Sequence, residues 1–273
     1  MPPRALTALV GIPILVSAVW WGGQWLSALV ALVAVLGIRE LYRMLPPGAG
    51  PLPVALGALW CVALVLGGRA SSDPSSFLRI SAGIWLAGAL IALLWLMALH
   101  PGRRHVVAGI YLLGGPLYIG FLLAHSLALR EAGGIEALGR NWLFLALAVA
   151  FATDTGAFLI GRSLGAHPMA PTISPNKTWE GSVGGLAFAI AASLMLGQIL
   201  ELEIPRWQQA VIGAAVGVLG QCGDLAESKL KRIANVKDAS SIIPGHGGVL
   251  DRLDSVVVSV PTVYYLVAVV FEP

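Results

Sequence analysis

Three aspartates near the C-terminal end of the chain have the residue type and spacing of a metal site. Asp224 stands at the end of an apolar run, and Asp251 and Asp254 follow in a polar segment. Carboxylate oxygens are the natural ligands of Mg²⁺, which proteins commonly hold together with the phosphates of a substrate. The spacing places Asp251 and Asp254 on one face if that segment is helical. These residues therefore predict a metal centre formed by Asp224, Asp251 and Asp254.

Basic side chains surround these aspartates between residues 221 and 255. Such cations can neutralise the charge of a polyphosphate. The glycine-rich stretch 244–248 can bring backbone amides close to an anion. Anchoring to anionic lipid is the alternative for the basic run 229–232, but it leaves the interleaved aspartates unexplained. A lone histidine such as His246 is more often a surface residue, so its phosphate role stays open. The residues that we expect to contact phosphate here are Lys231, Arg232, Lys237, His246 and Arg252.

A second group of polar residues lies between two prolines and the next apolar run, at 171–181. Thr178 is placed to cap the following helix, and Glu180 falls in its first turn. Ser174, Lys177 and Thr178 also offer a cation and hydroxyl donors at a helix N-terminus, where phosphate binds readily. From the residues alone, helix capping and phosphate binding are equally good interpretations of this segment.

Asp154 is an acidic residue inside an apolar run. Ionisable residues at membrane depth are costly and usually face a bundle interior or a polar cavity. A hydrogen bond between helices is the structural alternative, but a functional role is the more common reason for such a residue. We therefore expect Asp154 to support the site, for example by orienting one of its cations.

The composition is that of an integral membrane protein. Of 273 residues, 57% are hydrophobic and 11% are charged, and the mean hydropathy is +0.83. Soluble domains carry about 25% charged residues. In such a chain, a net charge of +3 reports membrane topology and contact with anionic lipid. We expect membrane lipid, and no nucleic acid, as a partner.

Runs of about 20 apolar residues predict membrane-crossing helices. With a cytoplasmic N-terminus, alternation puts twelve of the 17 lysines and arginines on the cytoplasmic side and five outside, as the positive-inside rule requires. Both motif regions then face the cytoplasm. The expected fold is an all-α, polytopic membrane helix bundle. Its nine runs are 5–22, 25–44, 52–68, 80–99, 106–128, 142–161, 180–200, 208–224 and 256–271.

The motifs divide the chain into two functional parts. Residues 1–135 hold apolar helices without a comparable charged cluster, whereas residues 136–273 hold the motifs and form the expected catalytic region. The two halves show no matching motifs. This absence counts against a transporter built from inverted repeats.

The order and spacing of the charged residues resemble a known family. Residues 228–254 read Ser-Lys-Leu-Lys-Arg, then Lys237-Asp238 after four residues, Pro-Gly-His-Gly-Gly after five more, and Asp-Arg-Leu-Asp after two. This pattern is similar to the signature of phosphatidate cytidylyltransferases, or CDP-diacylglycerol synthases. Residues 173–181 and the stretch from Asp154 to Arg162 resemble two further blocks of the family. Phe158 and Ala166 depart from it, since many members carry Tyr and Lys there.

The resemblance implies a reaction and a set of roles. CTP and phosphatidate would react to give CDP-diacylglycerol and pyrophosphate in phospholipid biosynthesis, with Mg²⁺ and a second cation such as K⁺. The enzyme would be a multi-pass protein of the cell (inner or plasma) membrane, its site facing the cytoplasm, and a homodimer. Asp224 and Asp251 would hold the metal with support from Asp254, and Lys231 would act on phosphate. Within the signature, Ser228 and Asp238 would join the substrate-binding residues.

Other functions stay open at this point. The nearest alternatives are a CTP-using polyprenol or phytol kinase and a cytidylyltransferase for an ether-lipid analogue. A transporter or channel could use Asp154 and Asp224 as ion ligands, although cations crowd on one side of the membrane. A structural scaffold that has lost activity is a further alternative, but the intact aspartates argue against it.

Overall fold

The computed structural model describes residues 3–44, 51–71, 73–98, 103–132, 134, 136–243 and 247–271. Most of these residues are helical, and the expected all-α class is confirmed. The chain divides into two compact units. One holds residues 1–131 with 238–251, and the other holds 132–237 with 252–273. The assignment of catalysis to residues 136–273 stays a prediction.

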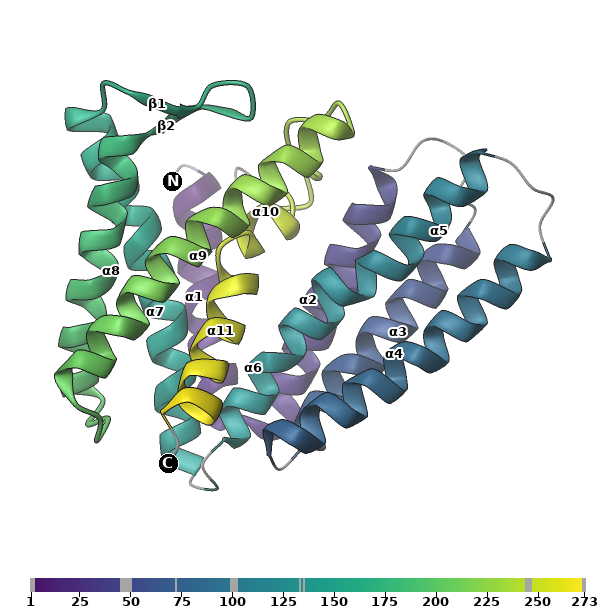
Figure 1. Cartoon of the computed structure of the whole chain (residues 1–273), viewed down its shortest axis with the longest axis horizontal. Coiled ribbons are helices and arrows are strands. Elements are labelled where there is room, and N and C mark those ends of the chain that lie inside the picture. The colour runs from purple at the N-terminus through teal and green to yellow at the C-terminus, as the bar shows by residue number, and fades with distance from the viewer. Residues whose placement is uncertain are drawn as a thin grey trace. The chain divides into compact units, whose positions relative to one another are not determined.

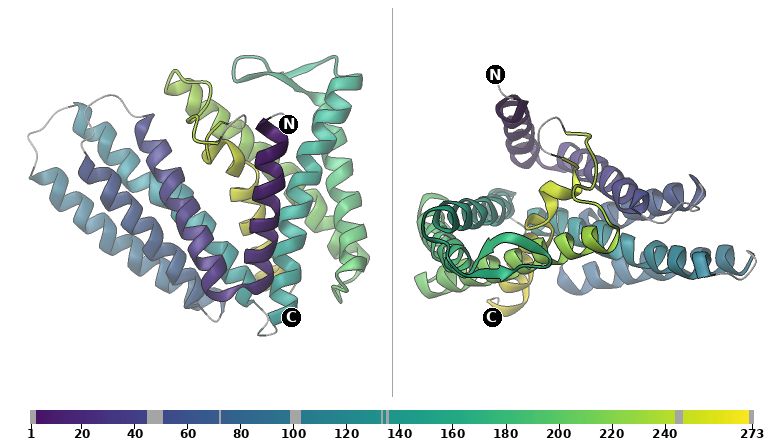
Figure 2. Two further views of the ribbon diagram at one scale, coloured as in Figure 1. Left: turned by 180° about the vertical axis from the view of Figure 1, so that it is seen from behind. Right: turned by 90° about the horizontal axis from the view of Figure 1, so that it is seen from above.

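The first unit consists of antiparallel helices (Figure 1). In chain order they are α1 (Pro3–Trp21), α2 (Gly23–Arg43), α3 (Pro51–Arg69), α4 (Pro74–Met97), α5 (Arg103–Gly115), the π-helical turn η1 (Pro116–Phe121) and α6 (Leu122–Glu131). The linker between α1 and α2 is very short, and α2 runs back from it (Figure 2). Gly22 and Gly23 have φ angles of 61° and 47°, which glycine adopts without a steric penalty. These two glycines allow the reversal.

The second unit carries a small hairpin on a helical bundle. Its elements are α7 (Glu136–Leu164), β1 (Pro168–Ala170), β2 (Ser174–Thr178), α8 (Trp179–Ile199), α9 (Arg206–Ile233), α11 (Val256–Tyr265) and the π-helical turn η2 (Leu266–Val270). The short helix α10 (Leu250–Leu253) precedes α11. The strands pair antiparallel, with Pro168 opposite Thr178, and the hairpin projects from the adjoining ends of α7 and α8 (Figure 1).

The membrane character that the sequence predicts is confirmed. Each of the nine expected runs coincides with apolar helical structure in the described residues. Seven of these segments are long and apolar enough to cross a membrane, and the apolar parts of α1 and α3 are shorter. The largest difference concerns the end of α9. Hydropathy predicts that the helix ends at Asp224, whereas in the structure it continues to Ile233. The helix continues because its polar residues pair along one face.

Glycines bring α7 and α8 into close contact. A Cβ atom on Gly156 of α7 would lie 2.5 Å from Cβ of Phe188, and one on Gly184 of α8 would lie 2.5 Å from Cβ of Ile160. Helices in membranes associate through small residues that let their backbones approach. This contact keeps α7 and α8, which the hairpin connects, close together.

Gly156→Ala should therefore destabilise the protein by about 1–3 kcal/mol, the usual cost of overpacking a well-packed contact. The matched control is Gly83→Ala in α4, where, among the described residues, no atom beyond the nearby backbone of α4 itself lies within 4 Å of the added Cβ. The control should be neutral or slightly stabilising, because alanine favours helix more than glycine does. Thermal unfolding of both variants in detergent checks the prediction. Equal melting temperatures would contradict it.

Candidate functional site

One face of α9 carries the polar residues of the site. Asp224, Glu227, Ser228 and Lys231 follow the spacing that aligns side chains on one side of a helix. Ser228 Oγ donates to Asp224 Oδ1 at 3.4 Å, and Lys231 Nζ lies 2.9 Å from Glu227 Oε2. A glutamate four residues before a lysine is the favourable order for such a pair. These contacts explain why α9 stays helical beyond its apolar part.

Asp254 joins this face from the segment that leads into α11. A Cβ atom on Gly223 would lie 2.7 Å from the backbone oxygen of Asp254, so glycine permits the approach. One carboxylate oxygen each of Asp224, Glu227 and Asp254 lie within 4.8 Å of one another. Sequence reasoning missed Glu227, although its spacing of three residues from Asp224 was the available signal. The structure thus brings together two of the three predicted metal ligands, with Glu227 beside them.

The hairpin adds a cation to the cluster. Lys177, near the end of β2, places Nζ 2.5 Å from Asp224 Oδ2. Both side chains are about three-quarters buried, with relative exposures of 23% and 27%. Their contact joins the two motif regions, which are more than 40 residues apart in the sequence.

Thr178 and Glu180 shape the start of α8. Thr178 Oγ1 accepts a hydrogen bond from the Gly181 amide at 3.1 Å, and so caps the helix. Glu180 accepts from the amides of Ala166 and His167 at 3.1 and 3.2 Å and pairs with His167 Nδ1 at 2.5 Å. Capping, one of the two interpretations of this segment, is therefore present. Phosphate binding by Thr178 stays a prediction.

Arg232 ties the end of α9 to the hairpin. Its Nε donates to the Ile173 oxygen at 3.2 Å, and Nη1 donates to the Val236 oxygen at 3.4 Å. Ser174 follows Ile173 at the start of β2 and is half-buried. The hairpin that carries Lys177 is therefore anchored at its far end as well.

Asp154 forms the interhelical hydrogen bond that the sequence suggested as an alternative. Its Oδ2 accepts from Ser255 Oγ at 2.9 Å, which links α7 to the segment before α11. The neighbouring Ser255 amide donates to Asp254 Oδ1 at 2.8 Å. Asp154 therefore supports the segment that presents Asp254, and a further role stays a prediction.

Asp251 belongs to the other unit, where it organises a loop. Its Oδ2 accepts from the amides of Ala239 and Gly248, at 3.0 and 2.8 Å, and the residue is 7% exposed. A part for Asp251 in metal binding stays a prediction. Lys237, Asp238 and Arg252 are exposed, and His246 lies outside the described residues.

The donor set of the second unit suits a divalent cation. Asp224, Glu227 and Asp254 supply oxygen ligands, which hard cations prefer. Three carboxylates held this close repel one another, and within the described residues Lys177 and Lys231 partly compensate their charge. A cation in the cluster would offset the remaining negative charge.

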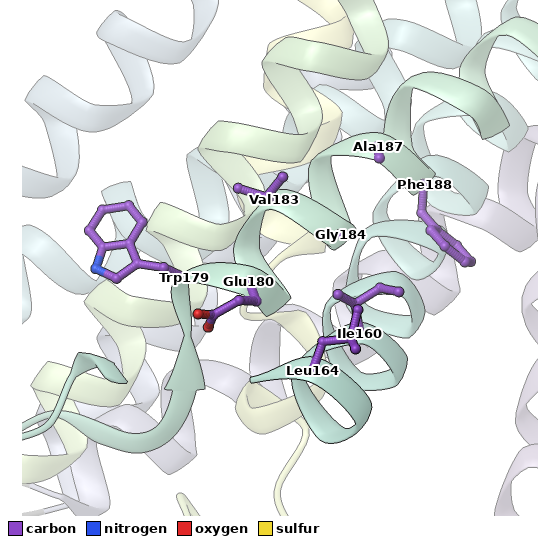
Figure 3. Close-up of a pocket in the computed structure, with 8 residues that line it drawn as sticks. All are labelled: Ile160, Leu164, Trp179, Glu180, Val183, Gly184, Ala187 and Phe188. Atoms are coloured by element: carbon purple, nitrogen blue, oxygen red, sulfur yellow. The ribbon is translucent and has the colours of Figure 1, made fainter. Parts of the chain in front are cut away.

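A pocket of about 500 Å³ lies between α7 and α8 (Figure 3). Ile160 and Leu164 of α7 face Val183 and Phe188 of α8 across it, and Glu180 supplies the polar group at one end. This lining suits hydrocarbon rather than a nucleotide.

Comparison with known proteins gives consistent matches over nearly the whole chain. The family model described as "Cytidylyltransferase family" matches residues 2–270. A Bacillus subtilis protein named phosphatidate cytidylyltransferase is 32% identical over 271 residues, which cover 98% of each chain. Proteins of the same name from Brucella suis, with 32% identity, and Staphylococcus haemolyticus, with 30%, cover 99% and 96% of this chain and 94% and 96% of their own.

Proposed function

Because the chain belongs to the cytidylyltransferase family, we propose that it is an integral membrane phosphatidate cytidylyltransferase. It converts CTP and phosphatidate to CDP-diacylglycerol and pyrophosphate. The observation that carries this proposal is the ion pair between Lys177 and Asp224, because it joins two separate motif blocks into one site that combines cations with clustered carboxylates. Such a site suits the transfer of a charged phosphorus group.

The reaction needs positioning more than acid–base chemistry. An oxygen of the phosphate monoester attacks the α-phosphorus of CTP, a new P–O–P linkage forms, and the bond to the β-phosphate breaks. The nucleophile is already an anion, so no strong general base is required. The chief obstacle is repulsion between two polyanions. Electrostatic stabilisation by fixed charges therefore supplies most of the catalysis, as in other phosphoryl-transfer sites.

Asp224, Glu227 and Asp254 are proposed to hold Mg²⁺. The metal-binding role that the family resemblance implies for Asp251 stays a prediction. Bound there, the ion would offset the negative charge of phosphate oxygens. Lys177 and Lys231 hold positive charge beside the cluster, where the substrate phosphates would lie. Exposed Lys237 and Arg252 are proposed to attract the incoming nucleotide. A second cation, K⁺, and a homodimeric state remain predictions from the resemblance.

Lys177→Gln tests the role of the hairpin. The variant should lower kcat/KM for CTP by about 10- to 100-fold, the equivalent of losing one charge-assisted hydrogen bond. Lys229→Gln is the matched control, since Lys229 is an exposed residue of α9, and its kinetics should be unchanged. Steady-state rates in mixed micelles measure both. Equal kinetics for the two variants would show that Lys177 has no role in CTP binding or catalysis.

The site is proposed to face the cytoplasm of a cell membrane. The distribution of lysine and arginine supports this orientation. It brings a soluble nucleotide and the headgroup of a membrane lipid to the same interface. Irregular backbone such as the hairpin is tolerated near a membrane where it lines a polar cavity.

The position of a label in CTP tests the proposed reaction against a lipid kinase. Purified protein is incubated with phosphatidate, Mg²⁺ and CTP labelled in either the α- or the γ-phosphate. A cytidylyltransferase moves the α-label into lipid and releases the γ-label as pyrophosphate. Transfer of the γ-label into lipid would instead establish a kinase.

A further inference from the structure

A buried glutamate of α2 contacts the motif loop from the other end of the sequence. Glu40 has a relative exposure of 0%. Its Oε1 accepts from Ser240 Oγ at 2.6 Å and from the Val249 amide at 3.0 Å. Its Oε2 accepts from the Leu250 amide at 2.8 Å. All three donors are neutral groups of the segment 238–251, which packs in the same unit as α2.

A carboxylate in this place needs strong hydrogen bonds, because burying a charge without them is costly. Glu40 satisfies both oxygens through a loop about 200 residues away. A neutral apolar residue would avoid that cost if α2 needed only to pack. The hydrogen bonds of Glu40 therefore stabilise the loop, and the packing of α2 does not require them.

The two adjacent glycines of the loop fit two carboxylates. A Cβ atom on Gly248 would lie 2.6 Å from Glu40 Oε2, and one on Gly247 would lie 2.7 Å from Asp251 Oδ2. Gly247 also has a φ angle of +83°, which favours glycine. The glycine pair thus allows Glu40 and Asp251 to approach the loop backbone closely.

Glu40 and Asp251 bind consecutive amides of one short segment. The Gly248 amide donates to Asp251, and the next two amides, of Val249 and Leu250, donate to Glu40. Asp251 follows Leu250 directly, so the amides that Glu40 holds set where the backbone of Asp251 lies. A shift of this segment would move Asp251 with it.

We propose that Glu40 is a positioning residue for the reaction: through its hydrogen bonds to Ser240, Val249 and Leu250, it holds Asp251 in its working geometry. This inference rests on the proposed function. It assigns α2 an indirect part in catalysis, since Glu40 of α2 fixes the backbone next to Asp251.

Glu40→Gln tests this role with little change of shape. The amide keeps one acceptor and turns a donor toward backbone N–H groups. A misplaced Asp251 removes an interaction made in the transition state, so kcat should fall about 10- to 100-fold while KM for CTP changes by less than about threefold. The Mg²⁺ concentration that gives half-maximal activity should rise. Ser27→Ala is the control, since it removes a buried hydrogen bond to Gly23 in the same helix, and its kcat should equal that of the wild type.

A double-mutant cycle separates positioning from general stability. Gly248→Ala should lower kcat as Glu40→Gln does, because its methyl group displaces the carboxylate. The cycle uses Glu40→Ala, Gly248→Ala and the double variant. Gly248→Ala should add little to the loss that Glu40→Ala causes alone, since the clash is gone, and such non-additivity identifies coupled residues. Ser240→Ala removes a single donor and keeps the test available if the Glu40 variants do not fold.

Each outcome bears on the proposal. Reduced kcat per folded enzyme, with coupling to Gly248, supports it. A wild-type kcat in Glu40→Gln, or in Ser240→Ala where only that variant folds, would overturn it, as would fully additive losses. A wild-type protein without cytidylyltransferase activity would instead refute the proposed function, so the two failures are distinguishable.

Discussion

Asp224→Asn should lower the CTP-dependent conversion of phosphatidate by about 1,000-fold, which corresponds to about 4 kcal/mol of transition-state stabilisation. The Asp224 carboxylate contacts Lys177 at 2.5 Å and lies within 4.8 Å of Glu227 and Asp254. Asparagine keeps the size of the side chain but removes its charge. The loss should therefore fall on catalysis and metal binding, while the folded protein stays extractable from membranes.

The control for this variant is Glu203→Gln, which makes the same carboxylate-to-amide change at an exposed position before α9. Its activity should match that of the wild type. Activity is measured as CDP-diacylglycerol formed by equal amounts of purified, folded protein. An Asp224→Asn enzyme with wild-type activity would remove the carboxylate cluster from the mechanism.

Replacing Asp251 by asparagine and by alanine should have different effects. The residue is proposed both to bind loop amides and to supply a negative charge for the reaction. Its Oδ2 accepts from the amides of Ala239 and Gly248, and an asparagine oxygen can accept the same bonds. Asp251→Asn should therefore keep the loop but lower activity by about 100- to 1,000-fold, because the charge is lost. Asp251→Ala should also destabilise the protein by about 1–3 kcal/mol, because buried donors lose their acceptor.

Activity and thermal unfolding, measured on both Asp251 variants, separate these tasks. Low activity in both, with a lower melting temperature only for alanine, is the expected result. An active Asp251→Asn enzyme beside an inactive Asp251→Ala enzyme would make Asp251 a purely structural residue of the loop. That outcome would leave the Asp224 cluster as the metal site.

The helices could be predicted from the sequence because burial in a membrane demands long apolar runs. The exact end of α9 could not, since hydropathy stops at Asp224 while side-chain pairing carries the helix on to Ile233. Local spacing did contain the signal for Glu227. The ion pair between Lys177 and Asp224 is a tertiary contact, and no local pattern specifies which lysine meets which aspartate.

Glu40 shows the main limit of sequence reasoning for this chain. Beside Arg39 and Arg43, it resembles an ordinary charge at the end of a membrane helix. Its burial and its three donors depend on a loop about 200 residues later. The role of Glu40 therefore could not be predicted from the sequence, because its hydrogen-bond partners are adjacent only in the folded chain.

The most direct test of the central claim is the stoichiometry of the purified enzyme. Protein in mixed micelles is supplied with CTP, phosphatidate and Mg²⁺, and both CDP-diacylglycerol and pyrophosphate are quantified. One molecule of pyrophosphate per CDP-diacylglycerol is expected, with both products dependent on phosphatidate and on Mg²⁺ and both lost in Asp224→Asn. Folded wild-type protein that forms no CDP-diacylglycerol under these conditions would contradict the proposed activity.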